Sequence, residues 1–192
     1  MRTILAVALR LSVLTAFLSL GGCYTVAVEY FPMHALTDQA PPTVRLEIVD
    51  SRPEDQGRGD GRMIGQYRGS FGIPNRVENG EGGVMPSTVS AATADALAGA
   101  GVLVTADAPI VLRATVLQFW SDGMVRVGSW VEVRYELVES GWETTVEGTS
   151  SEGSFFGSPV KAVETAIEEA LVDLAIQSTE VFSTQEFQDS VR

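Results

Sequence analysis

Few residues of this sequence could carry out covalent or metal chemistry. The 192 residues include one cysteine, Cys23, and one histidine, His34. A zinc site or a catalytic triad needs more of these residue types than the chain supplies. Carboxylate pairs such as Glu152 with Glu164 could act as acid and base, but 25 acidic residues place such pairs on any solvated surface. We therefore expect no catalytic residue, no metal site and no enzyme activity, with a carboxylate hydrolase as the weakest alternative.

Cys23 ends a pattern that is typical of a processed N-terminus. Arg2 and Arg10 make the start basic, residues 11–20 form an uncharged, mostly apolar run, and Gly21-Gly22 precede the cysteine. The run is shorter than the roughly 20 residues of a spanning helix but suits a signal peptide. The pattern resembles the lipobox of bacterial lipoproteins. By that resemblance, residues 1–22 are a signal peptide, and Cys23 carries a diacylglyceryl group and an N-acyl chain.

The expected anchor makes a transmembrane helix unnecessary, because each buried methylene contributes about 0.8 kcal/mol and two acyl chains anchor stably. In the lipoproteins that this pattern resembles, an aspartate after the cysteine retains the protein at the inner membrane. Tyr24 stands there instead, which favours the periplasmic face of the outer membrane. The alternative is an ordinary secretory peptide with an incidental cysteine. Apart from the covalent lipid we expect no cofactor.

The charge of the mature chain excludes one class of partner. The full sequence has 13 basic and 25 acidic residues, and removal of Arg2 and Arg10 with the signal peptide leaves 11 basic residues and a net charge of −14. Nucleic-acid binding depends on neutralising phosphates with Lys and Arg, so we expect no nucleic-acid partner. The expected partners are the membrane, through the lipid, and an envelope protein; the oligomeric state stays open.

The rest of the chain divides into three parts. Residues 23–42 contain three prolines and are expected to be an extended tether, in which the apolar run 26–31 could add a strand. Residues 43–183 are expected to form a single α+β domain, since no second boundary or repeat occurs. Residues 184–192 are expected to be a flexible tail.

Two hairpins form the best-specified part of the domain. Strands are predicted over residues 110–120, 125–137 and 142–155, with two-residue turns at Asp122-Gly123 and Ser140-Gly141. These turns predict one apolar face and one charged face. The predicted apolar pairs are Ile110–Tyr135, Leu112–Val133, Ala114–Val131 and Tyr135–Val146, and the charged pairs are Arg113–Glu132 and Arg134–Glu147.

The helical pattern completes the expected fold. Apolar stripes predict helices over residues 86–100 and 158–182, a strand over 43–50 and a short strand over 102–105. We expect an α+β fold with a mainly antiparallel sheet, built from the three-stranded meander, the N-terminal strand and the short strand. The two helices pack on one face of it.

Four residues are candidates for binding. Residues 51–84 form a long glycine-rich segment with few apolar groups, among them Tyr67. Asp50 and Arg52 lie at its base and either pair with each other or receive a partner group. Trp130 is expected on the charged strand face, opposite Thr115, where it is either a contact anchor or is covered by the glycine-rich segment.

The mature sequence resembles the YajG-type family of small bacterial envelope lipoproteins. The resemblance rests on Leu20-Gly21-Gly22-Cys23, Tyr30-Phe31-Pro32, Asp50-Ser51-Arg52, the glycine-rich stretch, the alanine-rich helix, the long hairpins and the terminal helix. It implies a location and a fold, and no catalytic residue. We therefore expect a non-enzymatic, lipid-anchored lipoprotein facing the periplasm that binds or assists another envelope component. The alternative is a small-ligand-binding lipoprotein with its site under residues 51–84.

Overall fold

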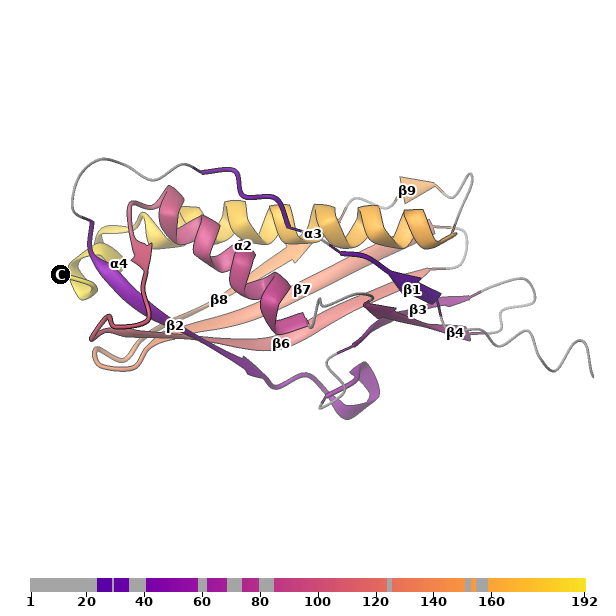
Figure 1. The fold of residues 1–192 in the computed structure, drawn as a ribbon, viewed down its shortest axis with the longest axis horizontal. Coiled ribbons are helices and arrows are strands. Elements are labelled where there is room, and N and C mark those ends of the chain that lie inside the picture. The colour runs from indigo at the N-terminus through magenta and orange to yellow at the C-terminus, as the bar shows by residue number, and fades with distance from the viewer. Residues whose placement is uncertain are drawn as a thin grey trace, which may run out of the picture.

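The computed structural model describes residues 24–28, 30–34, 41–58, 62–68, 74–79, 85–123, 126–150, 153–154 and 159–192. These residues form an open mixed sheet with two long helices, α2 (Met85–Gly99) and α3 (Pro159–Phe182), on one face. Figure 1 shows α3 running along the sheet and α2 lying at an angle to it, and the two helices contact each other. The predicted α+β class is confirmed.

The meander forms the centre of the sheet. Strands β6 (Val111–Gly123), β7 (Arg126–Leu137) and β8 (Trp142–Thr149) pair antiparallel, and β9 (Gly153–Ser154) pairs with the start of β7. Alternate side chains turn toward the helices, as the period of two requires. The predicted apolar face is confirmed, because Leu112, Ala114, Val131, Val133, Tyr135 and Val146 are buried and the remaining member, Ile110, is partly buried against the core.

The predicted register of the meander is wrong. Asp122 and Gly123 lie inside β6, opposite Gly128 and Val127, so the predicted turn at these two residues is wrong. The second turn does contain Ser140 and Gly141, but it spans residues 138–141. Up to Val116 the β6–β7 pairing is displaced from the prediction by four residues, and the β7–β8 pairing is displaced by two. An even shift keeps each side chain on its face. Beyond the register shift between Val116 and Gln118, the β6–β7 displacement is five residues. The observed pairs are Leu112–Leu137, Ala114–Tyr135, Val116–Val133, Tyr135–Thr144 and Arg134–Thr145.

Two strands share the second edge of β6. Strand β2 (Thr43–Asp50) pairs parallel with residues 111–116, and β3 (Met63–Arg68) pairs parallel with residues 121–123. Between them the chain leaves the sheet through the short helix η1 (Glu54–Gln56). Strand β5 (Leu103–Val104) extends β2, while β4 (Pro74–Asn79) and β1 (Tyr24–Val26) extend β3. The parallel pairs make the sheet mixed.

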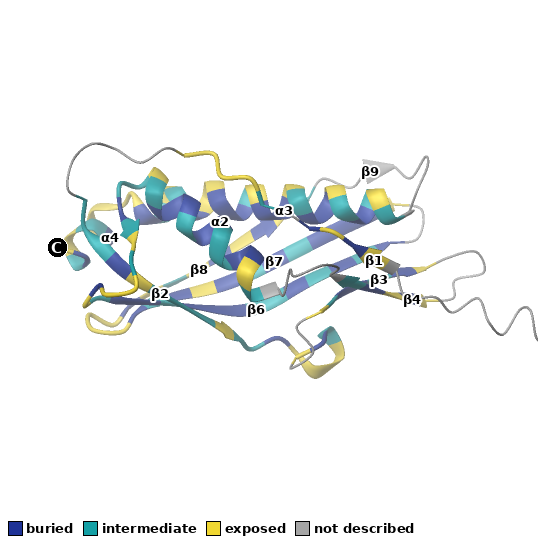
Figure 2. Cartoon of the chain, in the orientation of Figure 1, coloured by how far each residue is buried: buried dark blue, intermediate teal, exposed yellow. Residues whose placement is uncertain are grey.

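The helices follow from their apolar stripes. In α3 the buried side chains recur every three or four residues, which is the period of a helix face; they include Val163, Ile167, Ala170, Leu171 and Leu174. Gly148 of β8 lets the α3 backbone approach, since a Cβ there would meet Ala170 O and Leu174 N. Helix α2 packs on β2, β5 and α3 through Val89, Ala92, Ala96 and Leu97. Figure 2 shows this buried layer between the helices and the sheet.

The C-terminal residues are packed, and the prediction of a flexible tail over 184–192 is wrong. They form α4 (Gln185–Ser190), whose first turn is capped by the Thr184 hydroxyl accepting from the Phe187 amide. Phe187 is fully buried, with its ring 4.8 Å from Phe182 and 4.9 Å from Trp142 between centroids. The prediction failed because this short, mostly polar stretch gave no sign that its one aromatic side chain is buried.

The described part of the predicted tether also lies on the domain. Tyr24–Val26 are β1, in register with Val77, Glu78 and Asn79 of β4. Val26 and Val28 are buried, and the chain then crosses the helix layer. An extended spacer over these residues is therefore wrong; we call residues 24–28 and 30–34 the N-terminal segment.

Candidate functional site

The residues proposed for lipidation lie just before the described chain. Cys23 and the signal residues 1–22 are outside the described residues, but Tyr24 is already paired with Val77 in the sheet. Consecutive Cα atoms are about 3.8 Å apart, so Cys23 stands one step from a hydrogen-bonded strand. Whatever is attached to Cys23 is therefore held close to this end of the sheet.

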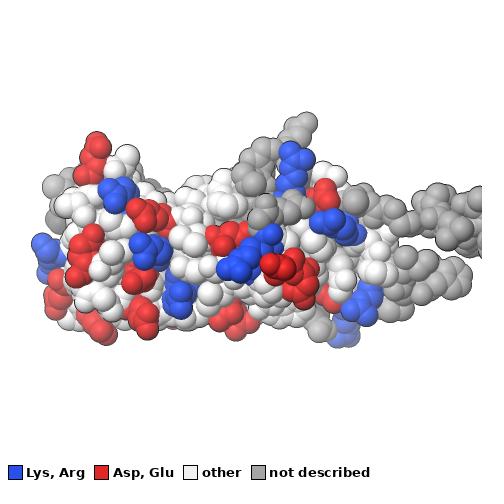
Figure 3. Space-filling view, turned by 90° about the horizontal axis from the view of Figure 1, so that it is seen from below, with Lys and Arg blue, Asp and Glu red and all other residues white. Residues whose placement is uncertain are grey.

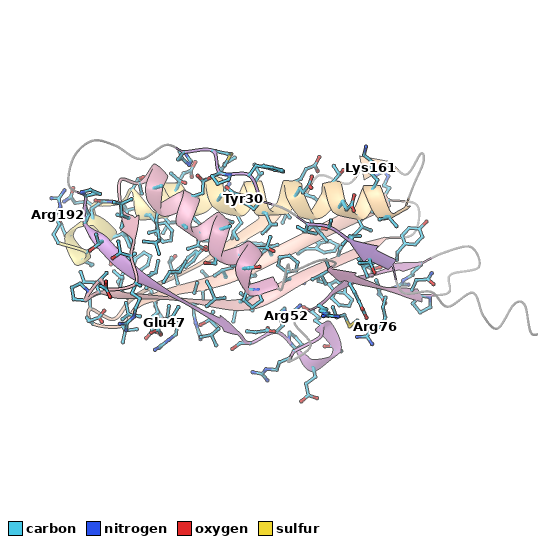
Figure 4. The ribbon with its side chains drawn as sticks, in the orientation of Figure 1. Tyr30, Glu47, Arg52, Arg76, Lys161 and Arg192 are labelled. Atoms are coloured by element: carbon cyan, nitrogen blue, oxygen red, sulfur yellow. The ribbon has the colours of Figure 1, made fainter. Side chains whose placement is uncertain are left out.

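Asp95 of α2 holds the N-terminal segment in place. Its carboxylate accepts from the Tyr30 hydroxyl at 2.6 Å, from the Met33 amide at 3.0 Å and from the His34 amide at 2.8 Å. The residue is only 4% exposed. In Figure 4 Tyr30 lies over the two helices. We call this arrangement, the Asp95 carboxylate with its donors Tyr30, Met33 and His34, the clamp. Its hydrogen bonds are charge-assisted and therefore strong.

The clamp shifts the protonation of both partners. Burial raises the pKa of the Asp95 carboxyl, but the hydrogen bonds from Tyr30, Met33 and His34 outweigh burial and hold the pKa below its ordinary value. Burial, together with the hydrogen bond and negative charge of Asp95, raises the pKa of Tyr30 well above its ordinary value. At neutral pH the carboxylate is therefore charged and the phenol is protonated, which is the state that the clamp requires.

Asp50 and Arg52 pair with each other at the base of the glycine-rich segment. Arg52 donates through Nε and Nη2 to the two carboxylate oxygens of Asp50, both at 3.0 Å, and is 0% exposed. It also donates to the carbonyls of Met63 at 2.8 Å and Gly57 at 3.2 Å. The guanidinium thus closes the chain excursion between β2 and β3. Of the two alternatives that the sequence left open, this geometry favours structural closure.

Tyr67 does not face solvent. It lies in β3 on the helix side of the sheet and is 7% exposed. The described chain gives it no open surface through which to receive a ligand.

Trp130 lies on the opposite face of the sheet, paired with Trp120 and Thr149 rather than with Thr115. It is half-buried, and its ring extends along the neighbouring Gly128, because a Cβ on that glycine would come within 3.1 Å of the ring. Trp130, Arg68, Asp122 and Gly123 line an open hollow of about 270 Å³. This hollow, which we call the Trp130 hollow, brings one predicted candidate together with three residues that were not predicted.

Charges surround the hollow on this face of the sheet. Figure 3 shows acidic and basic side chains interspersed on the side away from α3. Arg68 reaches Asp122 at 3.4 Å, and the Gln66 amide donates to the same carboxylate oxygen at 3.0 Å. Farther along, Arg113 bonds Glu136 at 3.2 Å and lies 3.9 Å from Glu47, so the predicted Arg113–Glu132 pair is wrong.

Neither Asp95 nor Asp122 was predicted as a site residue, for different reasons. Asp95 is the single charged residue of α2, and a lone carboxylate in an uncharged helix was a usable signal for a buried contact. Asp122 was assigned to a turn because Asp-Gly is common there. Its partner Arg68 comes from a parallel pairing between distant segments, and no local pattern announces such a pairing.

Of the two residues considered for acid–base chemistry, Glu164 has a structural contact. Glu164 accepts from the Ala27 amide at 3.2 Å, and Glu152 lies outside the described residues. His34 packs against Gly99, with its Nδ1 3.4 Å from the Asp95 carboxylate.

Across the described ranges, no group of three or more His, Cys, Asp or Glu side chains is arranged to hold a metal ion. None of the described helices is both long and apolar enough for a membrane span.

Comparison with known proteins identifies the fold. No family model and no curated protein matches the chain. Protein XCC0632 from Xanthomonas campestris, of family DUF330, is similar over 88% of this chain and 98% of its own, with 15% identity and a TM-score of 0.54. An uncharacterised protein matches over 82% and 96%, with 12% identity and a TM-score of 0.48. The PelC dodecamer from Paraburkholderia phytofirmans matches over 74% and 93%, with 13% identity and a TM-score of 0.34.

The first of these similarities shows a shared fold and nothing more, because its identity is low. The other two are too weak structurally to carry an argument. The resemblance to YajG-type lipoproteins stays a prediction.

Proposed function

We propose that this protein is a non-enzymatic lipoprotein, anchored through Cys23 at the periplasmic face of a bacterial outer membrane, that binds or assists another envelope component. The observation that carries the proposal is the position of β1. A strand that begins one residue after the lipidation site mounts the domain directly on its anchor. A direct connection between the lipidated residue and the sheet suits a protein that must present a surface at a fixed place on a membrane.

The N-terminal segment supports this reading. Its buried valines and its clamp on Asp95 attach the anchor side of the chain to both helices. A flexible linker needs neither burial nor a buried carboxylate partner. The segment therefore transmits the position of the anchor to the whole domain.

The sheet face away from the helices offers the surface for a partner. The long helices α2 and α3 cover the other face, only the short η1 contacts β3 and β6 on this side, and the face carries Trp130 beside charged residues. Aromatic side chains with charged neighbours are typical of protein contacts. The runner-up function, small-ligand binding next to the glycine-rich segment, is favoured by one observation, the contribution of Arg68 to the Trp130 hollow.

Anchoring is tested by fractionating cells that express the wild type, Cys23→Ser or Gly22→Ala. Wild type and Gly22→Ala, which keeps a small residue before the cysteine, should stay with the membranes and yield an acylated N-terminal peptide by mass spectrometry. Cys23→Ser should move to the soluble fraction. Retention of Cys23→Ser in the membrane, or a native N-terminus without acyl mass, would contradict the proposal.

The partner is sought by crosslinking intact envelopes. The matched control is an unrelated domain carried on the same first 23 residues, so that proximity caused by the lipid alone is subtracted. We expect one or a few envelope proteins to be enriched with this chain and lost with Cys23→Ser. An enrichment profile equal to that of the control would count against a dedicated partner.

A further inference from the structure

The strand order places the Trp130 hollow at the anchor end of the sheet. Strand β1 runs parallel to β4, with Tyr24 opposite Val77, and β4 begins at Pro74, opposite Arg68. Val77 lies three residues after Pro74, which is about 10 Å along the strand. Because β1 runs parallel to β4, the chain that leads back to Cys23 heads toward the end where Arg68 lies. Figure 1 shows β1 beside β3 and β4, far from the C-terminus.

The hollow contains both a cation and an anion at its open side. Arg68 and Asp122 approach to 3.4 Å while their side chains stay 49% and 31% exposed. An exposed pair of this kind is weak, so a ligand can replace it at little cost. Gln66 holds the Asp122 carboxylate from the side with a 3.0 Å hydrogen bond. The two charges are thus fixed in position and still open to solvent.

Trp130 supplies the apolar wall of the hollow. Gly128 leaves room for its ring, which reaches along β7 toward the anchor end. A tryptophan ring has an apolar body and a polar N–H, and such rings concentrate at the level of lipid headgroups. Its face also attracts ammonium groups.

We propose that the Trp130 hollow binds the zwitterionic headgroup of a phospholipid in the leaflet that holds the anchor. Arg68 takes the phosphate, as guanidinium groups do. Asp122 and the face of Trp130 take the ammonium group. A ligand with one charge of each sign satisfies both residues, whereas an anionic headgroup without an amine would be repelled by Asp122. The identity of the leaflet rests on the proposed function; the headgroup chemistry rests on the hollow alone.

The charge of the surrounding sequence agrees with this choice. The chain as a whole has a net charge of −12, so it has no general attraction to an anionic surface.

The test uses the protein as the cell produces it, purified in an uncharged maltoside detergent from whichever cell fraction contains it. The chemical shift of the Trp130 indole N–H is followed during titration with dihexanoylphosphatidylethanolamine. Parallel titrations use dihexanoylphosphatidylglycerol, free phosphoethanolamine and inorganic phosphate. We expect a saturable shift with the ethanolamine lipid, weaker binding of the glycerol lipid and the free headgroup, and no shift with phosphate.

Substitutions test the roles proposed for Arg68 and Asp122. Arg68→Gln should weaken the ethanolamine lipid about tenfold or more, since it removes a charge-assisted contact. Asp122→Asn should remove the preference for ethanolamine over glycerol lipid. Arg134→Gln, an exposed change on the same face of β7 and away from the hollow, should bind like the wild type. Unchanged melting temperatures show that each variant is folded.

Three results would overturn the proposal: no saturable shift, equal affinity of Arg68→Gln and wild type, or inorganic phosphate binding as tightly as the lipid. The titration does not depend on acylation in the cell, so its failure leaves the Cys23 fractionation result untouched. Conversely, a soluble wild-type protein that still binds the headgroup would overturn the anchoring proposal alone.

Discussion

The Tyr30 hydroxyl donates a 2.6 Å hydrogen bond to Asp95, a carboxylate 65 residues later in the chain. The same carboxylate receives the amides of Met33 and His34. One side chain of an otherwise uncharged helix thus fixes the path of residues 30–34 over α2.

Tyr30→Phe tests the clamp. Loss of a hydrogen bond to a charged, buried acceptor costs about 1.5–3 kcal/mol. We expect the amides of residues 33 and 34 to exchange their hydrogens at least about tenfold faster. Phe31→Leu, a change in the neighbouring side chain that is 71% exposed, should leave their exchange unaltered. Equal exchange in Tyr30→Phe and wild type would show that the clamp contributes nothing.

The clamp should weaken in acid. The pKa of Asp95 is lower in the folded protein than in the unfolded chain, so the stabilisation is present above the unfolded pKa and is lost as the pH falls through the folded value. Amide protection of the N-terminal segment, corrected for intrinsic exchange, should therefore drop below about pH 4. Asp95→Asn should be less protected at neutral pH and should lack this drop. A parallel pH profile in the variant would assign the loss to other carboxylates.

Phe187→Ala tests whether α4 belongs to the core. Its ring packs against Phe182 and Trp142, so truncation should lower the free energy of unfolding by about 3–5 kcal/mol in urea titrations. Glu186→Ala, one residue away and exposed, should stay within about 0.5 kcal/mol of wild type. Equal stability of the two variants would show that residues 184–192 do not contribute to the core.

Gly148→Ala tests the approach of α3 to the sheet. The new methyl group would collide with backbone atoms of Ala170 and Leu174, and we expect a loss of about 1–3 kcal/mol or more. Gly141→Ala is the matched control, because its φ of 71° strains an alanine by about 1–2 kcal/mol while nothing lies within 4 Å. Thermal melts should rank Gly148→Ala as the less stable variant. The reverse order would mean that α3 moves aside freely.

Much of the fold could be predicted from periodicity. Alternation identified the meander strands and their buried face, and the 3.6-residue stripe identified both long helices. The buried face was predicted correctly despite the wrong register because the strands are displaced by an even number of residues along β7–β8 and along β6–β7 up to Val116. The turn position itself could not be read from Asp122-Gly123, since a strand can run through this dipeptide when its neighbours on both sides supply hydrogen bonds.

The contacts that build the candidate site are non-local. Arg68 meets Asp122 only because β3 pairs parallel with the far half of β6, and Tyr30 meets Asp95 only because the chain recrosses the helices. Neither relation has a spacing signature. In contrast, the Asp50–Arg52 pair is two residues apart along one chain, and its closure role was among the alternatives weighed from the sequence.

Strand β1 begins at Tyr24, directly after Cys23, and this has a consequence for how the domain would be held. Under the proposed anchoring, the domain is held rigidly at the membrane rather than on a flexible linker. Strand β6 alone, with 13 residues, spans about 43 Å. The turn at residues 138–141 and the C-terminus lie at the end of the sheet away from β1. The proposed partner would then contact the domain at a fixed distance from the lipid, and residues inserted after Cys23 would increase that distance without altering the domain.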